Sequence, residues 1–461
     1  MTKKQIGSEP IYDARSLGTP RMLVLGLQHM FAMFGATVLV PALTGLDVAT
    51  TLLFAGLGTL LFHLLTKGKV PAFLGSSFAF IGGYQAIAPN KEPELLVYAC
   101  VGVAAAGLMY VVLSALFKAF GVKKVMRFFP PIVTGPIIIA IGLTLSSSAI
   151  TNCSANWLVA VVAIAIVIGF NMWGKGMTKI IPILLGVLGS YVFALIVDPA
   201  ARAHVVETVS EAAWIGLPVH GERTVFSLFG NADFNAGLLV SAIFTIVPLS
   251  LATMVEHIGD VCAISSTVGK NYMVDPGFHR TLLGDGLATS LAALFGAPAN
   301  TTYGENTGVL ALTKVYDPRV IRIAAYFAIL FSFSPKFAAL INSMPTAVVG
   351  GVSLVLYGMI SAVGVRNVVE NKVDFTKSRN LIVASVILVC ALGLSSNTVS
   401  FAIGSAVITL SPLAVASLAG IILNAVFPGK DFKFDSKNAA DAMNFEKEVT
   451  HKSSSKSKKR K

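Results

Sequence analysis

A small set of ionisable side chains stands inside stretches of this sequence that are otherwise apolar. Glu256, His257 and Asp260 follow an apolar run that begins at Gly237, and Glu305 lies in a second segment rich in small and polar residues. Glu256 and Asp260 are four residues apart and therefore share one face of a predicted helix. An ionisable residue in a membrane segment is costly to bury and commonly marks a solute or proton pathway. Glu256 and Glu305 are therefore predicted to be site residues rather than structural carboxylates.

The remaining polar candidates leave two interpretations open. Asp260 either belongs to the site or supports a residue that does. His29, which follows Gln28 in the first apolar segment, is either a hydrogen-bonding partner between helices or a direct ligand. Phe78 either packs in the core or stacks on a planar solute ring. Two further side chains, His257 and Asp285, are interpreted as residues that pair helices.

Composition determines which kind of element must hold these side chains. Of the 461 residues, 55% are hydrophobic and only 13% are charged, and the mean hydropathy is +0.76. Soluble domains carry about 25% charged residues, so this composition excludes an ordinary soluble protein. Apolar stretches of about 18 to 22 residues, each able to cross a hydrocarbon core, recur along the chain. Fourteen candidate spans lie near 22–43, 50–66, 71–89, 95–117, 129–148, 156–173, 179–197, 237–262, 279–297, 300–314, 319–343, 346–365, 379–394 and 405–427.

The basic residues are distributed unevenly between the two sides of these spans. With fourteen spans, 31 of the 35 lysines and arginines fall on the side that carries both termini. The positive-inside rule predicts that this side is cytoplasmic. The basic tail, residues 428–461, is interpreted as a solvated segment near anionic lipid rather than a nucleic-acid binder. The four cysteines are scattered and predict neither a disulfide framework nor a metal site.

Two of the candidate spans are interrupted. Segment 71–89 begins PAFLGSSFAFIGGY, and segment 298–314 reads PANTTYGENTGVLALTK. Proline and glycine at these positions disfavour a full-length helix, and irregular backbone at membrane depth is tolerated only against protein or a water-filled cavity. The two segments are the third and tenth spans, corresponding positions in two groups of seven. This arrangement is typical of a carrier with a midplane site and two inverted repeats.

The run from Glu305 to Lys314 resembles a known signature. It fits the pattern (Gln/Glu/Pro)-Asn-x-Gly-x4-Thr-(Arg/Lys/Gly) of the nucleobase–ascorbate transporter family. Gln28-His29 in the first span, SSFAF in the third and Glu256-His257 in the eighth match the family's other landmarks in order and spacing. The resemblance covers about residues 20 to 427. Within the family, GSSFAFIGG and NTTYGENTGV look most like bacterial uracil permeases.

The resemblance implies an all-α polytopic fold of fourteen transmembrane segments in two inverted seven-span repeats, with short antiparallel strands in spans 3 and 10. It also implies a core domain that moves against a gate domain, and a homodimer in the cytoplasmic membrane. The expected division is a cytoplasmic N-terminal segment 1–21, core domain 22–120 and 237–343, gate domain 121–236 and 344–427, and the basic tail 428–461.

The resemblance assigns a role to each site residue. The carboxylates of Glu256 and Glu305 would accept hydrogen bonds from the ring N–H groups of uracil. Backbone N–H groups near Phe78 and Gly304 would meet its carbonyls, and Phe78 with Ala36 would line the apolar walls. Uracil presents two N–H donors and two carbonyl acceptors, which ionised carboxylates and backbone donors complement. Ser77, Tyr303 and Asn306 are expected to support these groups.

The implied activity is proton-coupled uracil symport without a cofactor, driven by the proton gradient. Two carboxylates at one site raise at least one pKa, which suits proton coupling. In some family members the position four after the span-8 glutamate is a histidine implicated in proton transfer, and here it is Asp260. Either Asp260 shares the proton with Glu256, or coupling depends on Glu256 and His29.

Three other functions are considered. A purine (xanthine or uric acid) permease of the same family is the nearest, although purine-selective relatives typically carry Gln at the position of Glu305. A channel would need a ring of like charges or a repeated selectivity motif. An intramembrane enzyme would need a catalytic constellation, and Glu256-His257 lacks the second histidine of a metal-binding His-Glu-x-x-His helix. Neither feature is found in the sequence.

Overall fold

The computed structural model describes residues 6–179, 181–229, 234–394, 399–403 and 406–429, without the side chains of residues 36, 122–123, 305 and 401–409. The described chain is mostly helical, with two small antiparallel sheets. Its helices and strands are α1(Thr19–Thr44), α2(Val48–Leu65), β1(Leu74–Ser76), α3(Ile81–Ile87), α4(Pro93–Phe120), α5(Val122–Val125), α6(Pro131–Cys153), α7(Trp157–Trp173), α8(Pro182–Val197), α9(Pro199–Glu211), α10(Ala236–Ile246), α11(Ser250–Val268), α12(Phe278–Leu294), β2(Asn300–Thr302), α13(Glu305–Thr313), α14(Pro318–Ser332), α15(Pro335–Asn342), α16(Thr346–Glu370), α17(Ser378–Gly393), β3(Val399–Ile403), β4(Ala406–Leu410) and α18(Pro412–Val426).

Many of these helices are long and apolar enough to cross a membrane. Among the described residues six qualify singly: α1, α2, α4, α6, α16 and the run Ala236–Val268. The pairs α8–α9 and α14–α15 also qualify, but they bend by 114° and 87° respectively. Four shorter apolar helices accompany them, among them α7, α17 and α18. The predicted multi-span organisation is therefore confirmed in outline.

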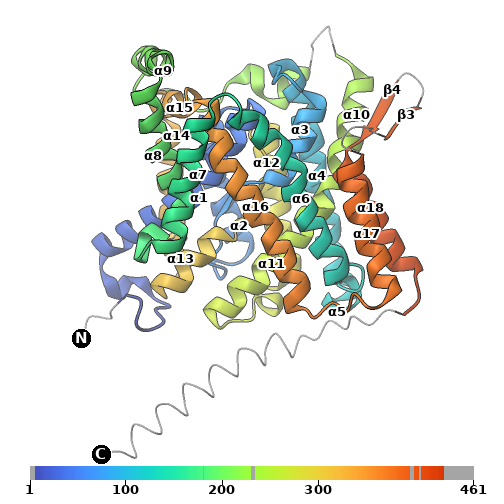
Figure 1. Cartoon of the computed structure of the whole chain (residues 1–461). Helices are drawn as coiled ribbons and strands as arrows, with labels where there is room; N and C mark the ends of the chain where they lie inside the picture. The colour runs from blue at the N-terminus through green and yellow to red at the C-terminus, as the bar shows by residue number, and fades with distance from the viewer. Residues whose placement is uncertain (1–5, 180, 230–233, 395–398, 404–405, 430–461) are drawn as a thin grey trace, which may run out of the picture.

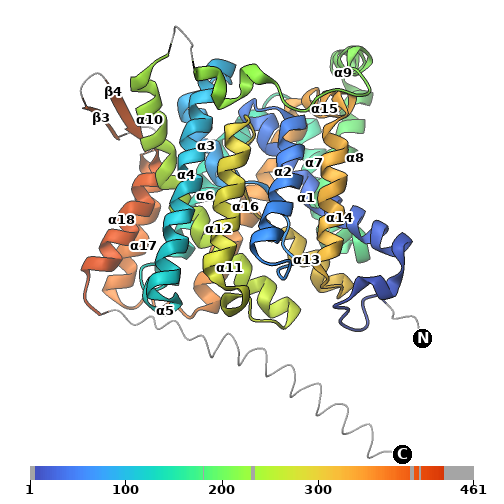
Figure 2. The ribbon, with the colours of Figure 1, turned by 180° about the vertical axis from the view of Figure 1, so that it is seen from behind.

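The helices pack in two groups. Helix α16 packs against α6 and α7, and α17 packs against α6 and α18. In the other group α12 packs against α4 and α2, and α14 packs against α1 and α2. Figure 1 shows α6, α7 and α16 toward the viewer, and Figure 2, turned by 180°, brings α2, α4, α12 and α14 forward. The strands of the interrupted segments pack against the second group, β1 against α2 and β2 against α12.

The predicted last span differs from the structure at its start. Residues 406–410 form strand β4, which pairs with β3, and the helix begins only at Pro412. The run Val407-Ile408-Thr409 is β-branched and favours a strand, while proline is well suited to the first turn of a helix. Residue 405 and the tail from residue 430 lie outside the described residues.

The eighth predicted span is helical throughout but not uniform. Helix α10 passes through a 3-10 turn, Val247–Leu249, into α11. Pro248 lies in this turn and lacks the N–H that an α-helical hydrogen bond needs. Glu256 and Asp260 consequently lie on α11, the second half of this span.

Candidate functional site

The two interrupted segments meet as a short antiparallel sheet at the centre of the protein. Strand β1 pairs with β2 so that Gly75 lies opposite Thr301. The pairing continues at both ends, where the Ser77 N–H donates to Ala299 O at 2.9 Å and the Tyr303 N–H donates to Phe73 O at 2.9 Å. The sheet therefore satisfies backbone groups that a broken helix would leave unpaired at membrane depth. The antiparallel strands predicted in these segments are confirmed.

Helix α2 holds the first segment in place. The Leu74 N–H donates to the hydroxyl of Thr59 at 2.9 Å, and that hydroxyl lies 3.3 Å from Leu74 O. The Nε2 atom of His63 lies 3.0 Å from the carbonyl oxygen of Ala72. Only 2% of His63 is exposed, so it acts as a buried partner of this strand.

A buried network holds the second segment to α11 and α12. The Nδ1 atom of His257 lies 2.8 Å from Asp285 Oδ2 and 3.0 Å from the hydroxyl of Thr302, while its Nε2 lies 2.9 Å from the hydroxyl of Thr281. Asp285 also accepts hydrogen bonds from the N–H and the hydroxyl of Thr302. The side chains of His257 and Asp285 are fully buried. The prediction that both residues pair helices is confirmed, and the network orients β2 as well.

Asn300 ties the same strand to α2 and, a second time, to α12. Its side-chain amide donates to Phe54 O on α2 at 2.7 Å, and its backbone carbonyl oxygen accepts from the hydroxyl of Thr289 on α12 at 2.9 Å. The position after β2, where α13 begins, is thus fixed from three helices.

Asp260 on α11 lies beside this starting point of α13. Glu256 and Asp260 are both partly exposed within the protein. A Cβ atom placed on Gly304 would lie 3.0 Å from Asp260 Oδ1, so this carboxylate lies beside the residue that precedes α13. The N-terminal end of a helix carries a partial positive charge that favours a neighbouring carboxylate. The backbone of Glu305 begins α13 at this point. The side chains of Glu305 and Ala36 lie outside the described residues.

His29 and Asn306 join the first helix to α13. The side-chain amide of Asn306 donates to His29 O at 3.1 Å and lies 3.3 Å from Nδ1 of the imidazole ring. Both residues are buried, at 0% and 1% exposure. This contact fits the interpretation of His29 as a partner between helices, and it lies one residue from Glu305.

The first segment contributes neutral and aromatic groups. Phe78 begins a 3-10 turn, Phe78–Phe80, that continues into α3. Its ring meets that of Tyr357 on α16 edge to face, with centroids 6.0 Å apart. The hydroxyl of Tyr303 donates to Ser76 O at 2.6 Å, and Ser77 is buried. Phe78 therefore packs against the opposite helix group, while Tyr303 braces the sheet.

The described residues include no group of three or more His, Cys, Asp or Glu side chains arranged to hold a metal ion. The site consists of carboxylates, half-helix ends and aromatic rings, which suits reversible binding of a small polar solute.

Comparison with known proteins shows the family to which this chain belongs. Residues 20–399 match the sequence model Xan_ur_permease, a permease family. The chain belongs to the nucleobase–ascorbate transporter family. It is therefore a multi-pass membrane transporter, not an enzyme.

Several curated members of this transporter family are close in sequence. A uracil permease of Bacillus caldolyticus is 39% identical over 433 residues, which cover 92% of this chain and 96% of that protein. A uracil permease of Bacillus subtilis (strain 168) is 39% identical over 445 residues, covering 93% and 97%. A uracil permease of Escherichia coli (strain K12) is 40% identical over 420 residues, covering 87% and 90%.

Solved structures show the same fold at much lower sequence identity. The transmembrane domain of the cyanobacterial bicarbonate transporter BicA has a TM-score of 0.57 and 15% identity, covering 89% of this chain and 99% of that one. Murine Solute Carrier 26 family member A9, an anion transporter, has a TM-score of 0.58 and 11% identity, covering 92% and 73%. This chain therefore shares its fold with a bicarbonate transporter and an anion transporter.

Sequence reasoning missed two residues of this transporter on α16, near the predicted site residue Phe78. Ser353 and Tyr357, four residues apart on this helix, are both buried. Tyr357 contacts Phe78, so this pair marks where α16 approaches the first interrupted segment. The helix that carries them is otherwise apolar and uninterrupted, and single hydroxyls are common in membrane helices, so neither residue stands out in the sequence. The only feature of the sequence that points to this pair is its spacing of four residues, which places two polar groups on one face of a helix.

Proposed function

We propose that this protein is a proton-coupled uracil symporter that works by alternating access. The observation that carries the proposal is the position of Asp260 beside Gly304, which turns the acidic face of α11 toward the start of α13. Uracil permease relatives that match along nearly the whole chain support the choice of uracil. The two half-helices that begin at the β1–β2 pair correspond to the interrupted helices that enclose carrier sites.

Uracil lies between the two interrupted segments in this proposal. Glu256 and Glu305 accept hydrogen bonds from its two ring N–H groups. Backbone N–H groups near Phe78 and Gly304 donate to its two carbonyl oxygens. Phe78 and Ala36 cover the faces of the ring. Tyr303, Asn306 and Ser77 hold the surrounding backbone, a role that their hydrogen bonds and burial support.

The proton travels on carboxylates of α11. Glu256 binds substrate and proton together, because a protonated carboxyl keeps a carbonyl oxygen that accepts from a ring N–H while its O–H carries the proton. Asp260, one turn away, shares the proton or replaces the carrier that is a histidine in some relatives. His29 contributes through Asn306 rather than by touching uracil. No cofactor is required, because the proton gradient supplies the energy.

The membrane arrangement follows from the same proposal. The fourteen segments form two inverted repeats, and both termini lie in the cytoplasm of a cell whose inner membrane the protein spans. The two helix groups correspond to a core domain (22–120 and 237–343) and a gate domain (121–236 and 344–427), a division that their packing supports. Two copies associate through gate domains, and membrane lipid surrounds the dimer.

Uptake of tritiated uracil by cells that lack their own carrier tests this function. Wild-type protein should accumulate uracil, and a protonophore should abolish the accumulation. Glu256→Gln and Glu305→Gln should each lower uptake about tenfold or more, since hydrogen bonds to charged groups are worth about 1.5–3 kcal/mol. Glu211→Gln, an exposed glutamate on α9, is the matched control and should leave uptake unchanged.

Three outcomes would contradict the proposal. Full uptake by both glutamine variants would contradict the assignment of Glu256 and Glu305 to the uracil site. Accumulation that ignores the protonophore would remove proton coupling. Stronger competition by unlabelled xanthine than by unlabelled uracil would make the protein a purine permease.

A further inference from the structure

The N-terminal segment forms a strap, residues 7–17, that is built into the fold. The Ile11 N–H donates to Lys314 O at 2.8 Å, and the Tyr316 N–H donates to Ile11 O at 2.8 Å. Ile11 thereby makes a parallel β-bridge with Val315, the residue between them. Both bridge partners are fully buried. The strap is therefore attached to the turn that joins α13 to α14.

Side chains strengthen this attachment. Asp317 caps the start of α14 and also accepts a hydrogen bond from the Ala14 N–H at 2.8 Å. Arg319 pairs with both Asp317 and Asp13, at 3.2 Å and 3.1 Å. The hydroxyl of Tyr12 donates to Val268 O at the end of α11. These contacts run to α14, which belongs to the group that contains α1, and to α11, which the His257–Asp285 contact joins to α12 of the same group.

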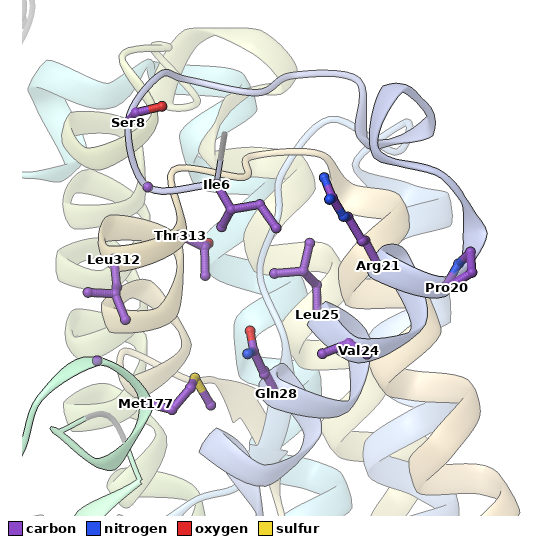
Figure 3. Close-up of a pocket in the computed structure, with 12 residues that line it drawn as sticks. Ile6, Ser8, Pro20, Arg21, Val24, Leu25, Gln28, Met177, Leu312 and Thr313 are labelled. Atoms are coloured by element: carbon purple, nitrogen blue, oxygen red, sulfur yellow. The ribbon is translucent and has the colours of Figure 1, made fainter. Parts of the chain in front are cut away.

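A cavity of about 800 Å³ opens beside the strap, between the two helix groups. Its lining includes Ser8 from the strap, Arg21 and Gln28 from α1, and Leu312 from α13. Met177 closes it from the turn between α7 and α8, which belongs to the other group. Figure 3 shows Ser8 at the upper rim of this cavity and Gln28 and Met177 at its lower side.

The deep end of the cavity reaches the neighbourhood of the proposed uracil site. Gln28 precedes His29, whose ring and carbonyl contact Asn306, the residue after Glu305. The Oε1 atom of Gln28 is buried and has no hydrogen-bond partner within the described part of the chain. A side-chain amide can accept from an N–H group and donate to a carbonyl oxygen, the two groups that a nucleobase carries.

We propose that this cavity is the cytoplasmic release vestibule for the nucleobase, and that the strap near Ser8 and the turn at Met177 form its gate. The inference rests on the proposed function for the identity of the solute. Gln28 receives the base as it leaves the site. The vestibule closes when Ser8 and Met177 approach each other, and it opens when they separate.

The contacts of the strap explain why the gate lies at this place. Alternating access moves one helix group as a body against the other. The strap moves with α11, α13 and α14, because its hydrogen bonds and ion pairs lie there. The Met177 turn moves with α7 and α8. The distance between Ser8 and Met177 therefore changes during transport, whereas the distance between Tyr12 and Lys270 does not.

Cross-linking of cysteine pairs tests this gate in the full-length protein. The test pair is Ser8→Cys with Met177→Cys, treated with a bis-maleimide whose central disulfide can be reduced. Cross-linking should lower uracil uptake about tenfold or more, because a tied gate cannot open. Reduction of the linker should restore uptake. Each single-cysteine variant, treated in the same way, should keep its uptake.

The matched control ties the strap to its own helix group. In this pair, Tyr12→Cys and Lys270→Cys replace residues whose ammonium and ring centroid lie 4.6 Å apart. Its cross-link should leave uptake within about twofold of the untreated variant, because the joined parts do not separate. Loss of uptake in this control would contradict the proposal that the strap moves together with α11, α13 and α14.

Further outcomes separate the gate from the identity of the solute. Undiminished uptake after the Ser8–Met177 cross-link, or failure of that pair to cross-link, would overturn the gate. If the untreated variants take up no uracil, the proposed solute is wrong. Opening of the gate is then followed by the rate at which a cysteine at position 24 is labelled, in a Val24→Cys variant, because Val24 lines the cavity. Labelling from the cytoplasmic side with an impermeant maleimide should slow when the gate is tied. An unchanged labelling rate would reject the gate whatever the solute is.

Discussion

The two interrupted segments share a backbone plan but differ in chemistry. We call residues 72–87 the first arm and residues 299–313 the second arm. Each has a three-residue strand followed by a short helix, and the strands pair antiparallel. The first arm is held by a hydroxyl and a histidine of α2 that bond its backbone. The second arm is held by the buried His257–Asp285 pair and borders the carboxylates of α11.

In the proposed site, this difference gives the two arms different tasks. The first arm would supply an apolar ring and backbone donors, which do not change with pH. The second arm begins its helix beside the carboxylate of Asp260 on α11, whose charge and protonation can change. In a proton-coupled carrier we therefore expect shape recognition in the first arm and coupling in the second.

The largest expected effect tests how the two arms are held. Asp285→Ala removes a buried carboxylate that is hydrogen-bonded to His257 and Thr302, and it should lower the free energy of unfolding by about 3–5 kcal/mol. Thr59→Val leaves the Leu74 N–H without its partner and should cost about 1–3 kcal/mol. Thermal unfolding of the detergent-purified protein measures both. Asp285→Asn, which keeps acceptor oxygens for Thr302, should fall between them.

Equal losses in Asp285→Ala and Thr59→Val would contradict the expectation that the carboxylate of Asp285 anchors its arm more strongly than the hydroxyl of Thr59 does. Ser210→Ala on the exposed helix α9 is a control, because its hydroxyl bonds only a neighbouring carbonyl. Its unfolding temperature should match that of the wild type.

Much of this arrangement could be predicted from the sequence. Pro71, Pro298 and the glycines that follow them interrupt apolar runs, and that pattern located both arms, whereas their strands were expected from the family resemblance. Family landmarks located Glu256 and Glu305. Helix positions were predictable because lipid requires long apolar segments, whose ends are marked by charges.

Other features depend on contacts that no local pattern encodes. The pairing of His257 with Asp285 crosses from α11 to α12, and the contact of Phe78 with Tyr357 crosses between helix groups. The strand at residues 406–410 was predicted as part of a helix because hydropathy does not distinguish a β-branched strand from an apolar helix. The strap is a short polar segment, so hydropathy did not indicate that it is part of the fold. Its position depends on hydrogen bonds to the turn at Val315, which lies far away in the sequence.

A smaller effect tests how closely the arms approach each other. A Cβ atom on Gly75 would lie 2.7 Å from two ring atoms of Tyr303, so Gly75→Ala forces the strands apart. Overpacking of this kind costs about 1–3 kcal/mol, and we expect uracil affinity to fall about tenfold while the protein still folds. Gly82→Ala is the matched control, because a Cβ there meets no atom within 4 Å. Binding of uracil to the purified protein, by calorimetry, measures both variants.

An affinity of Gly75→Ala equal to that of Gly82→Ala would mean that the spacing of the arms does not set the site. A loss in both variants would instead indicate sensitivity of the whole first arm. The comparison of the arms requires a loss in Gly75→Ala alone.

The smallest expected effect separates proton sensitivity in the second arm from the charged contacts of the strap below it. The side chain of Arg15 donates hydrogen bonds to Asp13 and lowers the pKa of that exposed carboxyl to about 2. Because this pKa is lowered, the contact with Arg15 stabilises the folded protein at any pH above the ordinary carboxyl pKa of about 4. This stabilisation is lost only as the pH falls through about 2. Between about pH 5 and pH 8, Asp13 therefore stays ionised. Asp13→Asn should leave the shape of the pH profile of uracil uptake unchanged, whereas Asp260→Asn should shift it. A shifted profile in Asp13→Asn would place part of the proton sensitivity in the strap, and the second arm would no longer account for coupling alone.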